Sequence, residues 1–190
     1  MLETLAPVYS LREVVVNPTL FTALALLVFS ALNEIIALFP FSIVIASQVA
    51  FIVGGMDTSL FIQLIFLVAV PVGVGSALGT LPLYALSYFG GRPAINKYEK
   101  YLKFSWHDIE KLGLYLNGGW YEEILIVVLR SIPLIPSIPV TIATGIIRVK
   151  FIKYILLTTL GFILRMILTL LIMGFSLGNL FKFINFIYNV

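Results

Sequence analysis

The amino-acid sequence predicts an all-α, polytopic membrane protein with two opposed re-entrant helical hairpins, each followed by a long transmembrane helix. Of its 190 residues, 61% are hydrophobic and only 11% are charged, and the mean hydropathy is +1.09. Soluble domains carry about 25% charged residues, so one integral-membrane domain is expected over 1–190. Two apolar blocks contain both prolines and a charged residue, which indicates where the helices break.

The more informative block covers residues 119–147 and holds Arg130 together with Pro133, Pro136 and Pro139. An arginine at the centre of a bilayer costs roughly 3 kcal/mol, and each proline removes a helical hydrogen bond. Irregular backbone is tolerated at membrane depth only where it is buried in protein or lines a wet cavity. The combination therefore predicts a polar site inside a membrane protein.

Basic residues flank this block on both sides. They are Arg92, Lys97, Lys100, Lys103 and Lys111 before it, and Arg148, Lys150 and Lys153 after it. Because cytoplasmic loops carry an excess of Lys and Arg, a single crossing would leave one basic cluster outside. We therefore expect 119–147 to enter and leave on the same side, in a multi-pass protein of the cell membrane whose segment 91–117 is cytoplasmic.

Residues 19–54 are apolar over a length that exceeds one span of about 20 residues but falls short of two spans with a turn. A first broken hairpin that turns near Pro40 fits this length. Glu34 precedes Pro40 by six residues, as Arg130 precedes Pro136. The spacing resembles a weak inverted repeat, and transporters often place binding sites where two broken elements meet at the midplane.

Residues 59–90 are expected to form a long membrane helix, tilted or kinked at Pro71 and Pro82, because the block is longer than one span requires. Gly75 and Gly79 lie one turn apart, and small residues at this spacing allow another helix to approach closely. The glycine-rich string around them superficially resembles a nucleotide-binding loop. Its spacing is wrong and it follows no soluble strand, so helix packing is favoured over phosphate binding.

The remaining segments complete the expected topology. Residues 1–16 have no cleavable pattern and are expected to form an interfacial segment. The string 90–93, Gly-Gly-Arg-Pro, should end one helix and start another, so that 91–117 forms amphipathic helices on the membrane surface. Residues 151–174 should form a membrane helix, and residues 176–190 a separate C-terminal tail helix.

Several short motifs follow one another between residues 30 and 165. They are Asn33-Glu34 with Phe39-Pro40; Gly75-x3-Gly79-x4-Tyr84-x5-Gly90-Gly91-Arg92; Gly118-Gly119; Arg130-Ser-Ile-Pro133-x2-Pro136; and Gly145, Phe151 and Gly161. In this order they resemble the DedA superfamily, also called VTT-domain or SNARE-associated Golgi proteins. The resemblance implies movement of lipids or lipid-linked phosphates between leaflets, by coupled transport or by scrambling.

The chain departs from the bacterial pattern of that superfamily at two places. Phe41 and Ser42 stand where a glycine and an acidic residue usually follow the first hairpin proline, and Pro136 stands where a second arginine is usual. The spacing of Pro133 and Pro136 is closer to the eukaryote-like VTT branch. The missing acid puts a two-carboxylate scheme of proton coupling in doubt.

Three intramembrane charges are the candidate substrate- or ion-binding residues. Glu34 is either a proton or cation carrier, or a hairpin polar group paired with Asn33. Arg130 either binds a phosphate headgroup through its planar fork or pairs with Glu34 and locks the fold. Arg165 is either a second anion ligand or snorkels to an interface. We expect Glu34 and Arg130 to approach near the midplane, directly or across a water-filled cavity, with Arg130 hydrated and reachable.

The sequence offers no catalytic set, so we expect neither an enzyme nor a cofactor or metal site. There is no cysteine, His107 lies outside the apolar blocks, and the scattered net charge of +3 gives no sign of nucleic-acid binding. A transporter or flippase for an anionic lipid, with or without coupling to protons or cations, is the first hypothesis. A passive phospholipid scramblase and a structural assembly factor are the alternatives, and a homo-oligomer fits all three. The residues expected to shape the site are Pro40, Pro133, Pro136, Gly75, Gly79 and Gly145.

Overall fold

The computed structural model describes residues 19–36, 62–102, 107, 110–111 and 121–188, and only the backbone of 94–102 and 173–188. In these ranges the regular structure is helical, as the sequence predicts. The elements are α2 (Leu20–Ile36), η1 (Ile65–Ala69), α5 (Val70–Gly79), α6 (Leu81–Leu102), α8 (Tyr121–Ser131), α9 (Ser137–Ile146) and α10 (Phe151–Tyr188).

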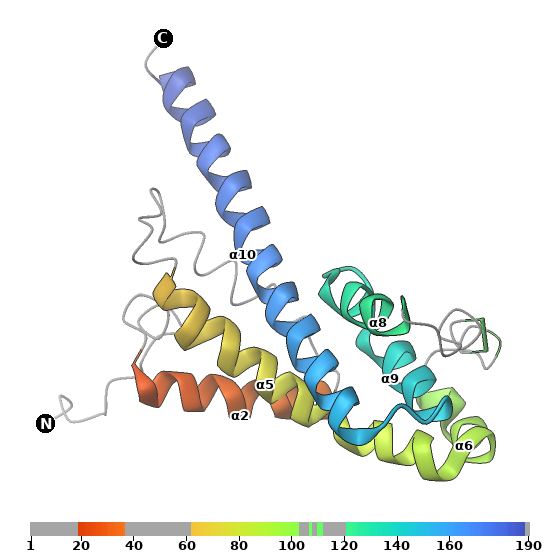
Figure 1. Ribbon diagram of the computed structural model, residues 1–190. Coiled ribbons are helices and arrows are strands. Elements are labelled where there is room, and N and C mark those ends of the chain that lie inside the picture. Colours follow the sequence, from red (N-terminus) through yellow and green to blue (C-terminus); the bar gives the residue numbers. More distant parts are fainter. Residues whose placement is uncertain (1–18, 37–61, 103–106, 108–109, 112–120, 189–190) are drawn as a thin grey trace, which may run out of the picture.

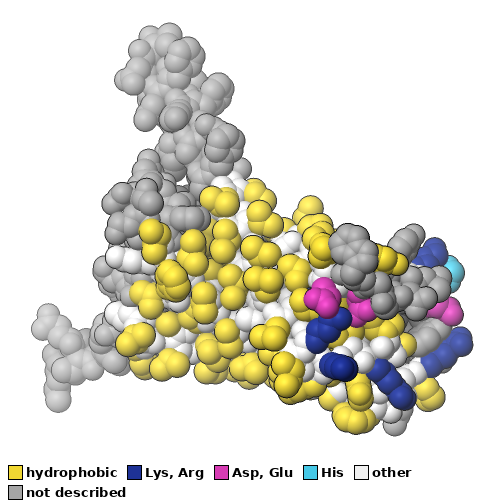
Figure 2. Space-filling model, in the orientation of Figure 1, with side chains coloured by type: hydrophobic (Ala, Val, Ile, Leu, Met, Phe, Trp, Pro, Cys, Tyr) yellow, Lys and Arg dark blue, Asp and Glu magenta, His cyan; other side chains and the backbone are white. Residues whose placement is uncertain are grey.

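Two described stretches are long and apolar enough to cross a membrane, Ile62–Pro93 and Phe151–Ile172. The first runs through η1, α5 and most of α6, and the second is the first part of α10. Large apolar side chains lie exposed along both, among them Phe66 and Ile152. Hydrophobic side chains cover much of the visible surface away from the end where the charged side chains gather (Figure 2). A surface of this kind suits lipid rather than water, and the chain is an all-α membrane protein.

The helices pack in three principal pairs around the two long stretches. α2 lies along α5, α9 lies along α6, and α8 lies against α10, which also crosses α5 (Figure 1). Tyr84 of α6, Ile126 of α8, Ile142 of α9 and Tyr154 of α10 belong to the buried cluster where these four helices meet. The hairpin of α8 and α9 is therefore held between the two long stretches.

The stretch Ile62–Pro93 is interrupted near Pro71 and near Pro82. The π-helical turn η1 ends one residue before Val70-Pro71. Pro71 has no backbone N–H to donate to a helical hydrogen bond, and its ring crowds the preceding turn. Thr80 separates α5 from α6 next to Pro82, and its hydroxyl donates to the carbonyl oxygen of Ala77 at 2.7 Å. The predicted long helix is thus two helical pieces joined at Thr80.

Close helix contacts occur at the glycines that the sequence singles out. A Cβ atom at Gly75 would lie 2.1 Å from the carbonyl oxygen of Leu27, and one at Gly79 would lie 2.3 Å from that of Ala31. A Cβ at Gly145 would lie 2.5 Å from the Cβ of Ser87. The absence of a side chain is therefore what lets α2 approach α5 and α9 approach α6.

The predicted end of a helix at residues 90–93 is confirmed. Gly91 has φ 55° and ψ −151°, a conformation that is open to glycine and strained for other residues, so the range of α6 covers two helices that meet there. Pro93 follows in the first turn of the second helix, where its missing N–H is tolerated.

The predicted separation of a tail helix from the preceding membrane helix differs from the structure. Helix α10 runs without interruption from Phe151 to Tyr188. Gly174 and Gly178 weaken a helix by about 1 kcal/mol each, but neither removes a backbone hydrogen bond. In lipid, backbone N–H and C=O groups must form their hydrogen bonds within the protein. A continuous helix therefore costs less free energy than a break after Gly174.

The described part of the segment 119–147, residues 121–147, folds as two helices with a break at its prolines. α8 ends at Ser131, a turn follows in which the Ile135 amide donates to the Ile132 carbonyl, and α9 begins after the extended Pro136. The start of α8 and the end of α9 lie at the same end of the molecule (Figure 1). The exposed charged side chains gather at this end (Figure 2). They include Arg92, Lys111, Glu123, Arg148 and Lys150.

Of the first predicted hairpin, 19–54, the structure describes only the part that forms α2. Pro40 and the expected turn lie outside the described residues, as do 1–16 and much of 91–117.

Candidate functional site

Arg130 occupies the buried centre of the helix assembly. It lies in the last turn of α8, immediately before the break, and its side chain is 0% exposed. Gly161 of α10 makes room for it, because a Cβ at Gly161 would lie 2.6 Å from the Cβ of Arg130. The absence of a side chain at Gly161, a position of the motif order, therefore lets α8 approach α10 at Arg130.

The guanidinium of Arg130 is only partly satisfied. Its Nη2 donates to the Thr141 hydroxyl at 3.0 Å and to the Tyr154 hydroxyl at 3.2 Å. The rings of Tyr154 and Phe162 lie beside it, with centroids 5.4 and 5.3 Å from its central carbon. Its Nε and Nη1 have no hydrogen-bond partner among the described residues. A buried guanidinium with two free nitrogens is suited to hold an anion.

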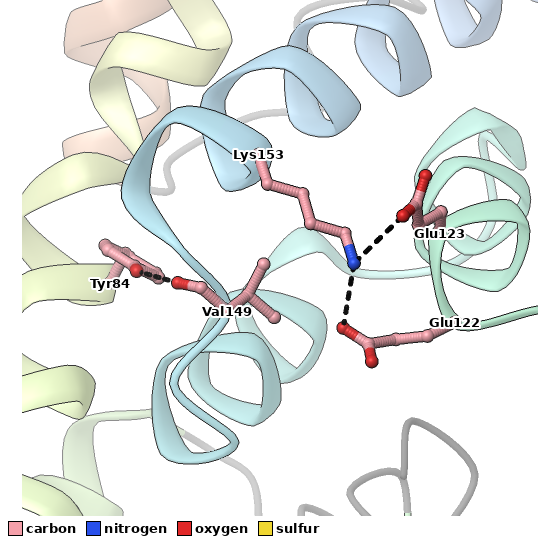
Figure 3. A network of polar contacts seen from close by, with 5 residues as sticks. All are labelled: Tyr84, Glu122, Glu123, Val149 and Lys153. Atoms are coloured by element: carbon pink, nitrogen blue, oxygen red, sulfur yellow. Dashed lines mark hydrogen bonds and ion pairs between the residues drawn. The ribbon is translucent and has the colours of Figure 1, made fainter. Parts of the chain in front are cut away.

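Tyr154 links this arginine to the joint in the long helical stretch. Its hydroxyl accepts from Arg130 and donates to the hydroxyl of Thr80 at 2.7 Å. Its ring stacks on Tyr84 with centroids 3.9 Å apart, and the Tyr84 hydroxyl donates to the carbonyl oxygen of Val149 (Figure 3). The side chain is therefore fixed on its ring face and at its hydroxyl, and it holds one edge of the Arg130 guanidinium in place.

Glu34, at the end of α2, reaches the first residue of α9. The Ser137 hydroxyl donates to its Oε2 at 2.8 Å, and Thr141, one turn further along α9, donates its hydroxyl to the Ser137 carbonyl at 3.0 Å. Since Thr141 also binds Arg130, both predicted charges contact the amino-terminal half of α9. No ion pair joins Glu34 to Arg130 in the described part of the chain, but the two charges lie within electrostatic reach.

Arg165 lies inside the protein rather than at an interface. Its side chain is 9% exposed, and its Nη2 donates to the carbonyl oxygens of Ile132, at 2.8 Å, and Ile135. These carbonyls belong to the break between α8 and α9, where helical partners are missing. Phe162 lies between the two arginines, with its centroid 5.6 Å from the Arg165 guanidinium carbon. Through these hydrogen bonds, Arg165 holds the backbone between α8 and α9 against α10.

Ion pairs join the start of α8 to the start of α10, at the charged end of the hairpin. Lys153 in the first turn of α10 lies 3.0 Å from a carboxylate oxygen of Glu123 and 3.9 Å from one of Glu122, both at the start of α8 (Figure 3). Partly exposed ion pairs of this kind contribute about 0–1 kcal/mol. This contact therefore orients α8 against α10 more than it stabilises the fold.

The sequence did not predict the roles of several polar residues at the site, and Thr141 was interpreted as a polar group of helix packing. Ser137 and Thr141 are four apart on α9, and Tyr154 and Thr158 are four apart on α10. Polar residues at helical spacing in apolar helices were an available signal, but each alone is ordinary in a packed membrane helix. Within the described residues, no three His, Cys, Asp or Glu side chains come together as metal ligands do.

The chain is similar to a curated membrane protein. It is 32% identical over 117 residues to undecaprenyl phosphate transporter A of Bacillus subtilis (strain 168). The match supports a membrane transporter. The aligned stretch covers 60% of this chain and 56% of that relative, so the chain spans little more than half of the relative's length. No family model and no solved structure matches the chain.

Proposed function

We propose that this protein moves a lipid-linked phosphate, or another anionic lipid, between the leaflets of the cell membrane. The observation that carries the proposal is the fully buried Arg130, whose Nε and Nη1 lack partners among the described residues. The similarity to a protein named for undecaprenyl phosphate transport points to the same chemistry. The resemblance of the motif order to the DedA superfamily supports it as well.

The charges around the break suit a bound phosphate. Arg130 and Arg165 carry two positive charges and Glu34 one negative charge, so the cluster has a net charge of +1 when all three are ionised. An unpaired buried charge is strongly unfavourable, and an entering anion would neutralise it. The amino end of α9 faces the same cluster through Ser137, and helix amino ends favour negative charge.

The closed site differs from the expectation that Arg130 is hydrated and reachable, since its side chain is 0% exposed. We interpret this arrangement as an occluded state of the transport cycle. Opening toward either leaflet then requires the break between α8 and α9 to move away from α10. The hydrogen bonds of Arg165 to the carbonyls of Ile132 and Ile135 are the contacts that such a movement would release.

The hairpin 119–147 is proposed to be re-entrant in the membrane. Cysteines placed singly at Lys111 and Lys150, both exposed, in the naturally cysteine-free chain are expected to react with an impermeant reagent from the same side. The reason is that a hairpin returns the chain to the side from which it entered. Labelling from opposite sides of oriented membranes would show that the segment crosses.

A leaflet-exchange assay in proteoliposomes tests the proposed function. We expect the purified protein to move a fluorescently labelled polyprenyl phosphate faster than protein-free liposomes do, and faster than it moves a labelled phosphatidylcholine. Equal rates for both lipids would favour a passive scramblase. An absence of movement would contradict transport.

Coupling to protons is tested at Glu34 in the same assay. Glutamine keeps an oxygen that accepts from Ser137 but cannot carry a charge, so Glu34→Gln should abolish any stimulation by a pH gradient and leave the protein folded. Glu110→Gln, at an exposed position outside the cluster, is the matched control and should respond as wild type does. A Glu34→Gln variant that is still stimulated would exclude this carboxylate as the carrier.

A further inference from the structure

Thr158 is a buried polar residue that the preceding argument does not use. It lies on α10, its side chain is 0% exposed, and its hydroxyl has no partner among the described residues. Threonines in helices commonly donate to the carbonyl four residues earlier. Thr141 does so to Ser137, and Thr169 does so to Arg165. Thr158 leaves this bond unmade, although a buried hydroxyl without a partner is unfavourable.

The buried side-chain polar atoms that lack a partner among the described residues belong to only three residues. They are Nε and Nη1 of Arg130, Oγ1 of Thr158 and Nε of Arg165. Both arginines have the ring of Phe162 beside their guanidinium groups. Buried groups that lack partners are rare in folded proteins. Three of the four atoms belong to two arginines that contact the same ring, and the fourth lies one helical turn before that ring on α10.

Helical spacing brings Thr158 to the level of Arg130. Tyr154, Thr158 and Phe162 follow one another at intervals of four residues, so they lie on one face of α10. The residues before and after Thr158 in this row both contact the Arg130 guanidinium, with ring centroids at 5.4 and 5.3 Å. Thr158 lies between them in this row, on the face of α10 that meets Arg130.

We propose that Thr158 is a ligand of the anion held by Arg130. Its hydroxyl donates to one oxygen of a tetrahedral phosphate while Nε and Nη1 of Arg130 bind others. The three donors come from two helices, α8 and α10, so the anion is bound only while these helices are together. The inference rests on the proposed function, because it assigns a further binding residue to the same site.

The substitution Thr158→Val tests whether Thr158 binds the anion or only supports the fold. Valine keeps the shape and removes a hydroxyl that makes no protein hydrogen bond, so the melting temperature should stay the same or rise. The mole fraction of labelled polyprenyl phosphate that gives half-maximal movement in proteoliposomes should increase about tenfold, as expected for the loss of one hydrogen bond to a charged group. The maximal rate should change little.

Two further variants complete the test. Thr158→Ser keeps the hydroxyl and should restore half-saturation close to that of wild type. Thr169→Val, on the same helix, removes a hydroxyl that donates to a backbone carbonyl at 2.7 Å, and should leave half-saturation unchanged. Half-saturation like that of wild type in Thr158→Val, whether or not its stability falls, would overturn the assignment of Thr158. Failure of wild type to move the phosphate lipid would overturn the proposed function instead.

Discussion

Replacing Arg130 by lysine is expected to remove most lipid movement while the protein still folds and inserts. The guanidinium offers two parallel donors to a phosphate, whereas the ammonium of lysine is a point charge without the fork. Hydrogen bonds to charged groups contribute about 1.5–3 kcal/mol, so losing one of the pair should slow transport at low substrate about tenfold to a hundredfold. The leaflet-exchange rate at equal protein level measures this.

This prediction has one matched control, a lysine in place of an exposed arginine, and one further variant, an alanine in place of Arg130. Arg148→Lys makes the same chemical change at an exposed position and should transport as wild type does. Arg130→Ala should also reduce expression, because it leaves Thr141 and Tyr154 without their buried partner. Comparable movement by wild type and Arg130→Lys would remove the bidentate role and leave Arg130 as a structural charge.

Replacing Gly75 by alanine is expected to lower the yield of folded protein severely. The new Cβ would lie 2.1 Å from the Leu27 carbonyl oxygen and 2.1 Å from the Ser30 hydroxyl oxygen, so α2 and α5 would have to separate. Alanine gains about 1 kcal/mol in helix propensity, but overpacking of this kind typically costs about 1–3 kcal/mol or more. The steric cost should exceed the gain in helix propensity, because the Leu27 backbone cannot move aside as a flexible side chain could.

Size-exclusion profiles and melting temperatures in detergent measure the effect. Leu78→Ala, three residues along the same helix at an exposed position, is the control and should be nearly neutral. A melting temperature of Gly75→Ala at or above that of wild type would show that α2 and α5 are not packed as described.

The features of the fold that follow from local chemistry were predictable. The composition was sufficient to predict an all-α membrane protein. Gly91 and Pro93 mark a helix boundary because their backbone preferences differ from those of other residues. The break after Ser131 follows from the prolines in the same way. The unbroken α10 was missed because Gly174 and Gly178 only weaken a helix, and the sequence alone does not say when the surroundings override them.

The candidate site was predictable in its charges but not in its contacts. Arg130 stands out because an arginine in an apolar stretch is rare. Its partners Thr141 and Tyr154 do not, since hydroxyl groups are common in packed membrane helices and their bonds depend on how α8, α9 and α10 meet. Arg165 binds the backbone between α8 and α9 only because the same tertiary arrangement brings α10 next to it, so the sequence alone did not show this contact.

The central claim, that Arg130 recognises a phosphate in the membrane, is tested most directly by ligand stabilisation of the purified protein. A bound ligand stabilises the folded state by about 2.7 kcal/mol at a hundredfold excess over its Kd. We predict that a polyprenyl phosphate raises the melting temperature of wild type, that the uncharged polyprenol of equal length does not, and that Arg130→Lys abolishes the difference. Equal stabilisation by the phosphate and the alcohol, or an undiminished phosphate effect in Arg130→Lys, would contradict the claim.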